Sequence, residues 1–166
     1  MSQHFEAVCQ FHRKFGVPVR DTPQPLSKDE HEFRLGFMRE ELDEYEHAVN
    51  RGDLVKQLDA LTDLLYVIYG TLALHGFPAN EAFALVHHAN MQKQRASSAQ
   101  ESAASTGRGH SLDVVKPEGW ESPEPKLVLL LATQQVFTDP RERAQRTREL
   151  MTRFLPTYTT RDVDCA

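Results

Sequence analysis

Five acidic residues stand within the seven positions of the segment EELDEYE (40–46), and carboxylates this dense form either a solvated surface or a cation site. The direction of each side chain separates the two cases, because a helix turns by about 100° per residue. On that count Asp43 and Glu46 fall on a polar side. The apolar side, which carries Phe37, also receives the other three acids: Glu40, Glu41 and Glu44.

Carboxylates on an apolar face need a cation. Burying one without a partner costs roughly several kcal/mol, and neighbouring carboxylates repel and raise one another's pKa. Arg34 is the one basic residue near this face, and a single guanidinium cannot neutralise three acids. A divalent metal ion can.

A second acidic pair follows in the segment QLDALTDLLYVIYG (57–70). Asp59 and Asp63 are four residues apart and share a helix face. Gly70 lies on the same face, where the missing side chain permits close approach. Two aspartates opposite three glutamates would form an all-oxygen site, which suits Mg²⁺ or Mn²⁺. Taken alone, Asp59 and Asp63 could equally form an ion pair or hydrogen bond with a neighbouring helix.

The elements that must position these acids are helices, and the predicted class is all-α, a bundle of four to six helices. Apolar periodicity, caps and breakers predict them at residues 3–15, 28–50, 54–75, 78–95, 126–137 and 139–154. Ser27 followed by Glu30 predicts a capping box. We expect one domain over 1–166, with core helices in 3–95, a flexible loop at 96–115, an extended KPEGW segment at 116–125 and a helical extension at 126–155.

Composition excludes several classes of protein. The chain is 40% hydrophobic and 26% charged, which is typical of a globular domain. Its net charge of −5 argues against general binding to nucleic acid. The longest apolar run, LVLLLA (127–132), is too short to span a membrane. Two cysteines, Cys9 and Cys165, and a charged N-terminal segment predict a cytoplasmic protein without disulfides or a signal peptide.

The two acidic segments, EELDE (40–44) and DALTDLLYVIYG (59–70), together resemble the signature of the MazG-like, all-α NTP pyrophosphohydrolases. Two further segments, NMQK (90–93) and KPEGW (116–120), resemble one branch of that superfamily. The resemblance covers about residues 28–125.

The resemblance implies an activity and a set of ligands. In the family, paired helices hold Mg²⁺ or Mn²⁺, which bind the triphosphate of a nucleotide while water cleaves it to a monophosphate and pyrophosphate. Glu41, Glu44 and Asp63 match the family's metal positions. Many members carry a glutamate where this chain has Ala60, so Asp59 is either a replacement ligand or the site has more water.

The remaining site residues follow from these roles. Glu40, the carboxylate least committed to metal, is our candidate for the general base that activates water. We expect the substrate to contact Asn90, whose amide should point inward, and Lys93, Lys116 and Tyr66. Trp120 could stack on a base or anchor the packing of its loop.

The helix at 57–74 is apolar almost all round, which predicts a central buried helix that needs covering on all sides. We therefore expect a homodimer or homotetramer, which in the family places the site near the subunit junction. Among substrates we favour dUTP or a related pyrimidine deoxynucleotide, in nucleotide-pool housecleaning. The alternatives are phosphoribosyl-ATP pyrophosphohydrolase activity, a di-iron carboxylate bundle that uses the E-x-x-H pair Glu44 and His47, and a non-catalytic nucleotide-binding module.

Overall fold

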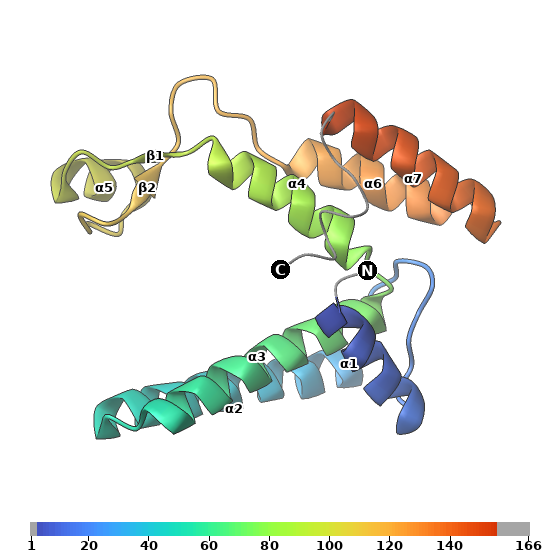
Figure 1. The fold of residues 1–166 in the computed structure, drawn as a ribbon, viewed down its shortest axis with the longest axis horizontal. Helices are drawn as coiled ribbons and strands as arrows, with labels where there is room; N and C mark the ends of the chain where they lie inside the picture. Colours follow the sequence, from blue (N-terminus) through green and yellow to red (C-terminus); the bar gives the residue numbers. More distant parts are fainter. Residues whose placement is uncertain (1–2, 156–166) are drawn as a thin grey trace.

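The protein is described by a computed structural model over residues 3–155, which is predominantly helical (Figure 1). The predicted all-α class is confirmed, with seven helices in the described residues where the sequence predicted four to six. The elements are α1 Gln3–Lys14, α2 Lys28–Arg51, α3 Leu54–His75, α4 Ala79–Met91, β1 Gln94–Arg95, α5 Ala99–Thr106, β2 Val114–Val115, α6 Glu124–Val136 and α7 Pro140–Phe154.

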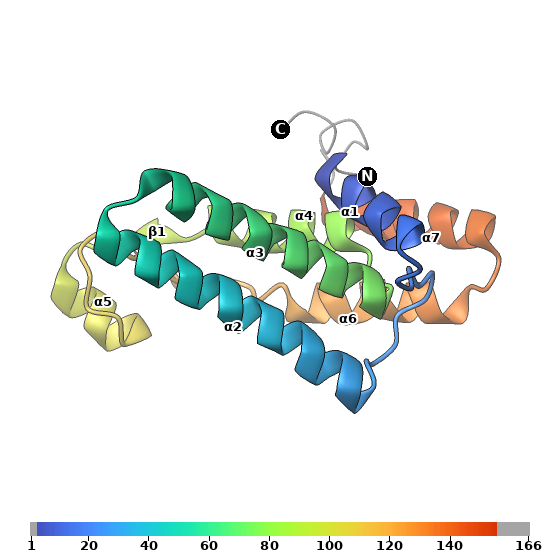
Figure 2. The same ribbon diagram turned by 90° about the horizontal axis from the view of Figure 1, so that it is seen from below.

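The two longest helices form an antiparallel hairpin that carries the acidic residues. The predicted capping box is present: the Ser27 hydroxyl accepts from the Glu30 amide, and the Glu30 carboxylate accepts from the Ser27 amide. Gly52 ends α2 in the left-handed conformation at φ 67°, and Asp53 immediately caps α3 through the Lys56 amide. Such a short connection forces α2 and α3 to lie side by side (Figure 2).

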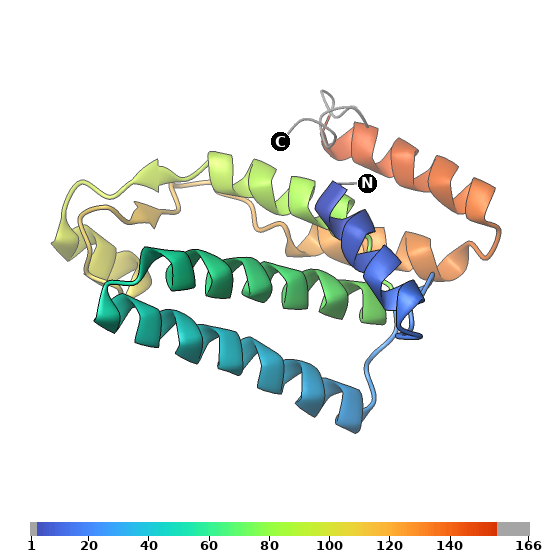
Figure 3. The same cartoon turned by 60° about the horizontal axis from the view of Figure 1, so that its bottom comes forward.

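The helices form two layers, each with a small apolar core (Figures 1 and 3). One layer contains α1, α2 and α3, and its cluster joins α1 and α3 to the start of α4 through Phe5, Cys9, Ala73 and Ala79. The other layer contains α4, α6 and α7, whose cluster is formed by Leu85, Leu130, Met151 and Leu155. The helical extension predicted at 126–155 therefore packs on α4.

The segment 96–115 is not the flexible loop that the sequence predicted. It contains α5, and its last two residues form β2, which pairs antiparallel with β1 directly before the segment. The fourth helix also stops at Met91 rather than at Arg95, because Gln94 and Arg95 enter this strand pair.

Hydrogen bonds, more than apolar burial, hold this small lobe of residues 94–115 together. The Asp113 side chain is 6% exposed and accepts from the hydroxyls of Ser102 and Thr106, at 2.7 Å each. The Ser98 hydroxyl caps α5 by accepting from the Glu101 amide. A helix built of Ala, Ser and Thr has little apolar periodicity, which explains why the sequence did not reveal it.

The prediction that α3 is buried on all sides is wrong for the single chain. Ala60, Gly70, Ala73 and Leu74 are its buried residues, whereas an apolar face including Leu54, Leu58 and Leu65 is exposed. The neighbouring helices α1 and α2 cover only part of its circumference (Figure 1). No single helix in residues 3–155 has the length and apolarity to cross a membrane; only α3 and α4 taken together, across a 117° bend, reach them.

Candidate active site

The carboxylates of α2 and α3 gather around Glu41. Burial raises the pKa of this half-buried side chain, and the negative charges of Asp63, Glu44, Glu40 and Asp59 raise that pKa further. The other four candidate acids therefore lie close enough to Glu41 for their charges to act on it. A cation bound there would remove the repulsion that this arrangement creates.

The depth of these acids differs from the prediction. Glu41 points toward the helix interface, but Glu40, Glu44, Asp59 and Asp63 are exposed. The reason is that the apolar stripe on which the glutamates were placed is itself only partly covered, since Phe33 remains exposed. Of the three glutamates that the angular count placed on the apolar side of α2, only Glu41 is partly buried.

Nearby basic residues leave most of this negative charge uncompensated. The Arg34 guanidinium turns away from the acids and donates to Thr71 Oγ1 and to the Val67 carbonyl oxygen. Lys56 Nζ lies 2.9 Å from Asp59 Oδ2, and this bond is the first cause of the raised pKa of Lys56. The side chains of this pair are 62% and 52% exposed, so it contributes little to stability. For Asp59 the structure therefore shows an ion pair within α3 itself, not the contact with a neighbouring helix that the sequence left open.

The donor chemistry fits a hard divalent cation, although the carboxylates do not close on a common point. No group of three or more Asp, Glu, His or Cys side chains in residues 3–155 is close enough to hold a metal ion as they stand. Carboxylate oxygens facing one another are nevertheless the ligands that Mg²⁺ and Mn²⁺ prefer. The assignments of Glu41, Glu44, Asp63 and Asp59 as ligands stay predictions. The E-x-x-H pair of Glu44 and His47 is not part of any such group either, so the di-iron alternative gains no support.

Two of the predicted substrate contacts converge on one tryptophan. Lys93 Nζ and Lys116 Nζ lie 5.8 Å and 4.5 Å from the centroid of the Trp120 ring. The indole Nε1–H donates to the Ala89 carbonyl oxygen at 2.7 Å, which fixes the KPEGW segment to the end of α4. Trp120 thus has the packing role, and the two ammonium groups near its ring belong to residues 23 positions apart in the sequence.

The other two substrate candidates lie differently from the prediction. Asn90 is exposed, so its expected inward direction is wrong: the face of α4 that it shares with Phe83 is open in this chain. Tyr66 packs edge-on against Phe11, with the ring centroids 5.4 Å apart. Its role toward substrate stays a prediction.

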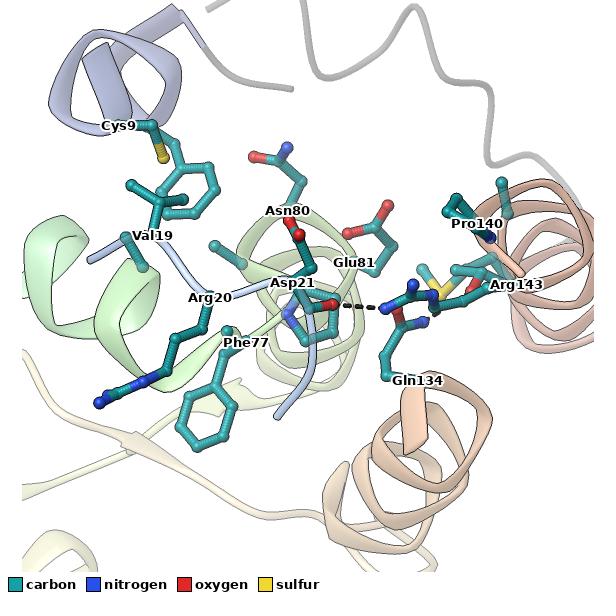
Figure 4. A pocket seen from close by; sticks show the side chains of 18 of the residues that line it. Cys9, Val19, Arg20, Asp21, Phe77, Asn80, Glu81, Gln134, Pro140 and Arg143 are labelled. Carbon is teal, nitrogen blue, oxygen red and sulfur yellow. Dashed lines mark hydrogen bonds between the residues drawn. The ribbon is translucent and has the colours of Figure 1, made fainter. Parts of the chain in front are cut away.

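A cleft of about 700 Å³ lies elsewhere, between α1, the corner joining α3 and α4, and the helices α6 and α7 (Figure 4). The Arg143 guanidinium crosses it to donate to the Asp21 carbonyl oxygen. None of the five candidate acids lines this cleft. The cleft is therefore separate from the carboxylates of α2 and α3.

Comparison with known proteins shows the family to which this chain belongs. Residues 8–90 match the family described as phosphoribosyl-ATP pyrophosphohydrolase, a range that contains α2, α3 and all five acids. The chain is also 39% identical over 71 residues to "Uncharacterized protein L479" of Acanthamoeba polyphaga mimivirus, covering 40% of this chain and 28% of that protein. This chain thus spans less than a third of the length of that relative. With half of its residues matched, the chain belongs to the phosphoribosyl-ATP pyrophosphohydrolase family, within the MazG-like all-α NTP pyrophosphohydrolases.

Proposed function

We propose that the protein is a nucleoside triphosphate pyrophosphohydrolase that depends on Mg²⁺ or Mn²⁺ and releases pyrophosphate from a nucleotide. The observation that supports this most is the raised pKa of Glu41, caused by partial burial and by four further carboxylates. Family membership supports the reaction class. The metal and the substrate are our inference from the chemistry of the acids.

In this proposal Glu41, Glu44 and Asp63 would hold the cation between α2 and α3, with Asp59 as a further ligand. Bound there, the cation would neutralise phosphate charge and lower the pKa of a coordinated water. Glu40 then orients a water molecule and accepts its proton. The water oxygen bonds to phosphorus as the bridging P–O bond breaks, and pyrophosphate leaves.

The two lysines over Trp120 are the proposed contacts for the phosphates. Their ammonium groups lie 5.8 Å and 4.5 Å from the centroid of the Trp120 ring, and phosphoryl transfer depends mainly on positioning and charge neutralisation. Asn90 and Tyr66 are the further proposed contacts, for the nucleoside. We favour dUTP or a related pyrimidine deoxynucleotide as substrate, and the family match makes phosphoribosyl-ATP the second candidate.

We also propose that a second copy of this chain covers the exposed apolar face of α3, giving a homodimer or a homotetramer. The face includes Leu54, Leu58 and Leu65, and exposing so many leucines on one helix is unfavourable in water. The acids lie on the same helix pair, so the active site would sit near the subunit junction. We further infer that the protein acts in the cytoplasm.

The experiment is pyrophosphate release from a panel of NTPs, dNTPs and phosphoribosyl-ATP, with and without Mg²⁺ or Mn²⁺. Glu44→Gln should abolish metal-dependent turnover and keep the helical circular dichroism, whereas Glu46→Gln, on the polar side of α2, should retain it. Glu40→Gln should lower kcat by about 10²–10⁴-fold, the usual contribution of a general base. Near-normal turnover by Glu44→Gln, or no release from any substrate by the native chain, would overturn the proposal.

A further inference from the structure

The guanidinium of Arg34 is buried without a carboxylate partner. Arg34 is 8% exposed, and none of the ion pairs recorded in residues 3–155 includes it. Its Nε donates to Thr71 Oγ1 at 3.1 Å and its Nη2 donates to the Val67 carbonyl oxygen at 2.6 Å. Its Cζ lies 5.7 Å from the centroid of the Phe37 ring. Burial of an unpaired guanidinium is unfavourable, and it lowers the pKa of Arg34. Such a residue calls for a role that an apolar side chain could not fill.

The surroundings hold this guanidinium in one place. A Cβ added to Gly70 would lie 2.6 Å from Arg34 Nη2 and 2.7 Å from His12 Nε2, so α3 leaves just enough room for both groups. The His12 ring is itself fixed, because Nδ1 is bonded to the Pro18 carbonyl oxygen at 3.1 Å. The position of the guanidinium is therefore limited by His12 on the side of α1 and by its hydrogen bonds to Thr71 and Val67 on α3.

The same helix pair repeats its contacts at intervals of two turns. Arg34 meets its acceptors near one end of the pair, and Glu41 faces the charge of Asp63 in the middle. Near the other end Gln57 Nε2 donates to the Ala48 carbonyl oxygen at 3.4 Å, a long and weak bond. The short connection at Gly52 and Asp53 holds the pair at that end, and the Arg34 bonds are the strong side-chain link at the far end.

We propose that Arg34 is a positioning residue, whose fork on Thr71 and Val67 sets the register of α2 against α3 and so brings Glu41 and Glu44 opposite Asp63. This inference rests on the proposed function for its catalytic meaning. The two donors of the guanidinium that form these bonds point to a hydroxyl and a carbonyl oxygen of α3 and not to a carboxylate. The proposed role is therefore geometric: the hydrogen bonds of Arg34 keep the carboxylates of α2 opposite the carboxylates of α3.

Three variants separate geometry from charge and from stability. Arg34→Met removes the fork and keeps an apolar stem, Arg34→Lys keeps the charge without the fork, and Thr71→Val removes one acceptor and keeps the shape. The matched control is Thr133→Val on α6, because both threonine hydroxyls donate to the carbonyl oxygen four residues earlier at 2.9 Å, and Thr133 has no guanidinium on it.

Two measurements are made on each variant. The first is Mn²⁺ binding by calorimetry without nucleotide. The second measurement needs no metal. Double electron–electron resonance gives the distance between two nitroxide labels, one attached to Glu46→Cys on α2 and one to Thr62→Cys on α3. Both positions are exposed. Cys165 is replaced by Ser, Cys9 is buried, and excess unlabelled protein suppresses distances between subunits. The unfolding midpoint of every variant is recorded.

We expect Arg34→Met and Arg34→Lys to shift or broaden the nitroxide distance by at least about 1.5 Å, the rise of one helical residue. Mn²⁺ affinity should fall on the order of 10-fold, with a smaller effect in Thr71→Val and none in Thr133→Val. An unchanged distance in both Arg34 variants would overturn the register role. A shifted distance with unchanged Mn²⁺ affinity would overturn its link to the acids. Failure of the proposed function is distinct: native protein would neither bind Mn²⁺ nor release pyrophosphate, while the distance would still depend on Arg34.

Discussion

Gly70→Ala is the sharpest test of how tightly α2 and α3 are held, because the same substitution at Gly36 provides its control. Both glycines lie inside helices, where alanine is normally favoured by about 1 kcal/mol. At Gly36 an added Cβ meets nothing within 4 Å, so Gly36→Ala should raise the free energy of unfolding by about that amount.

At Gly70 the same methyl group would lie 2.6 Å from Arg34 Nη2 and 2.7 Å from His12 Nε2. Overpacking of this kind costs about 1–3 kcal/mol, and losing the guanidinium bonds to Val67 and Thr71 costs about 1.5–3 kcal/mol, since they involve a charged donor. Together with the gain in helix propensity these effects leave a net cost of about 1.5–5 kcal/mol. Because the guanidinium is the far end of a flexible side chain and can shift, we expect Gly70→Ala to lower the free energy of unfolding by the lower part of this range, about 2 kcal/mol.

The assay is thermal unfolding followed by circular dichroism at one fixed protein concentration, because association would shift the midpoint. For a chain of this size about 1 kcal/mol corresponds to 2–4 °C. Gly36→Ala should therefore raise Tm by about 2–4 °C and Gly70→Ala should lower it by about 4–8 °C. If Gly70→Ala were as stable as Gly36→Ala, the guanidinium would not be held as described.

Two further predictions concern the lobe and the assembly. Hydroxyl bonds from Thr106 and then Ser102 lower the pKa of Asp113 to about 2, so its stabilising effect on residues 94–115 is present above the unfolded pKa of about 3.9 and is lost as pH falls toward 2. Amide exchange should show this loss of protection in the native chain and no such pH dependence in Asp113→Asn; equal protection at pH 5 and pH 2 would contradict it. Leu58→Glu should reduce the oligomer mass seen by light scattering, whereas Leu112→Glu, at the same 69% exposure, should leave it unchanged; equal masses would argue against the α3 interface.

The long helices could be predicted because their signals are local. The Ser27 and Glu30 capping box and the helix-ending Gly52 fix the bounds of α2 within the sequence itself. Helix α5 was missed because its stability comes from Asp113, eleven residues after Ser102, and not from an apolar stripe. Hydrogen bonds at that distance leave no periodic signal.

The candidate site shows the same division. Spacing places Glu40, Glu41 and Glu44 on one face, but only Glu41 is partly buried. Whether a face is covered depends on tertiary packing, which is why Asn90 was expected inside and is exposed. The acceptors of Arg34 on α3 could not be predicted, because they depend on how far one helix lies along the other.

Trp120 is the sole tryptophan of the chain. The ammonium groups of two lysines lie near its ring, and its indole N–H donates to a carbonyl oxygen of α4. Its fluorescence therefore comes from a single, known environment, so no label is needed to follow events there. Any anion that draws either ammonium group away from the indole should change the emission intensity or wavelength. The protein thus carries an intrinsic optical probe at the place where we expect phosphates to arrive.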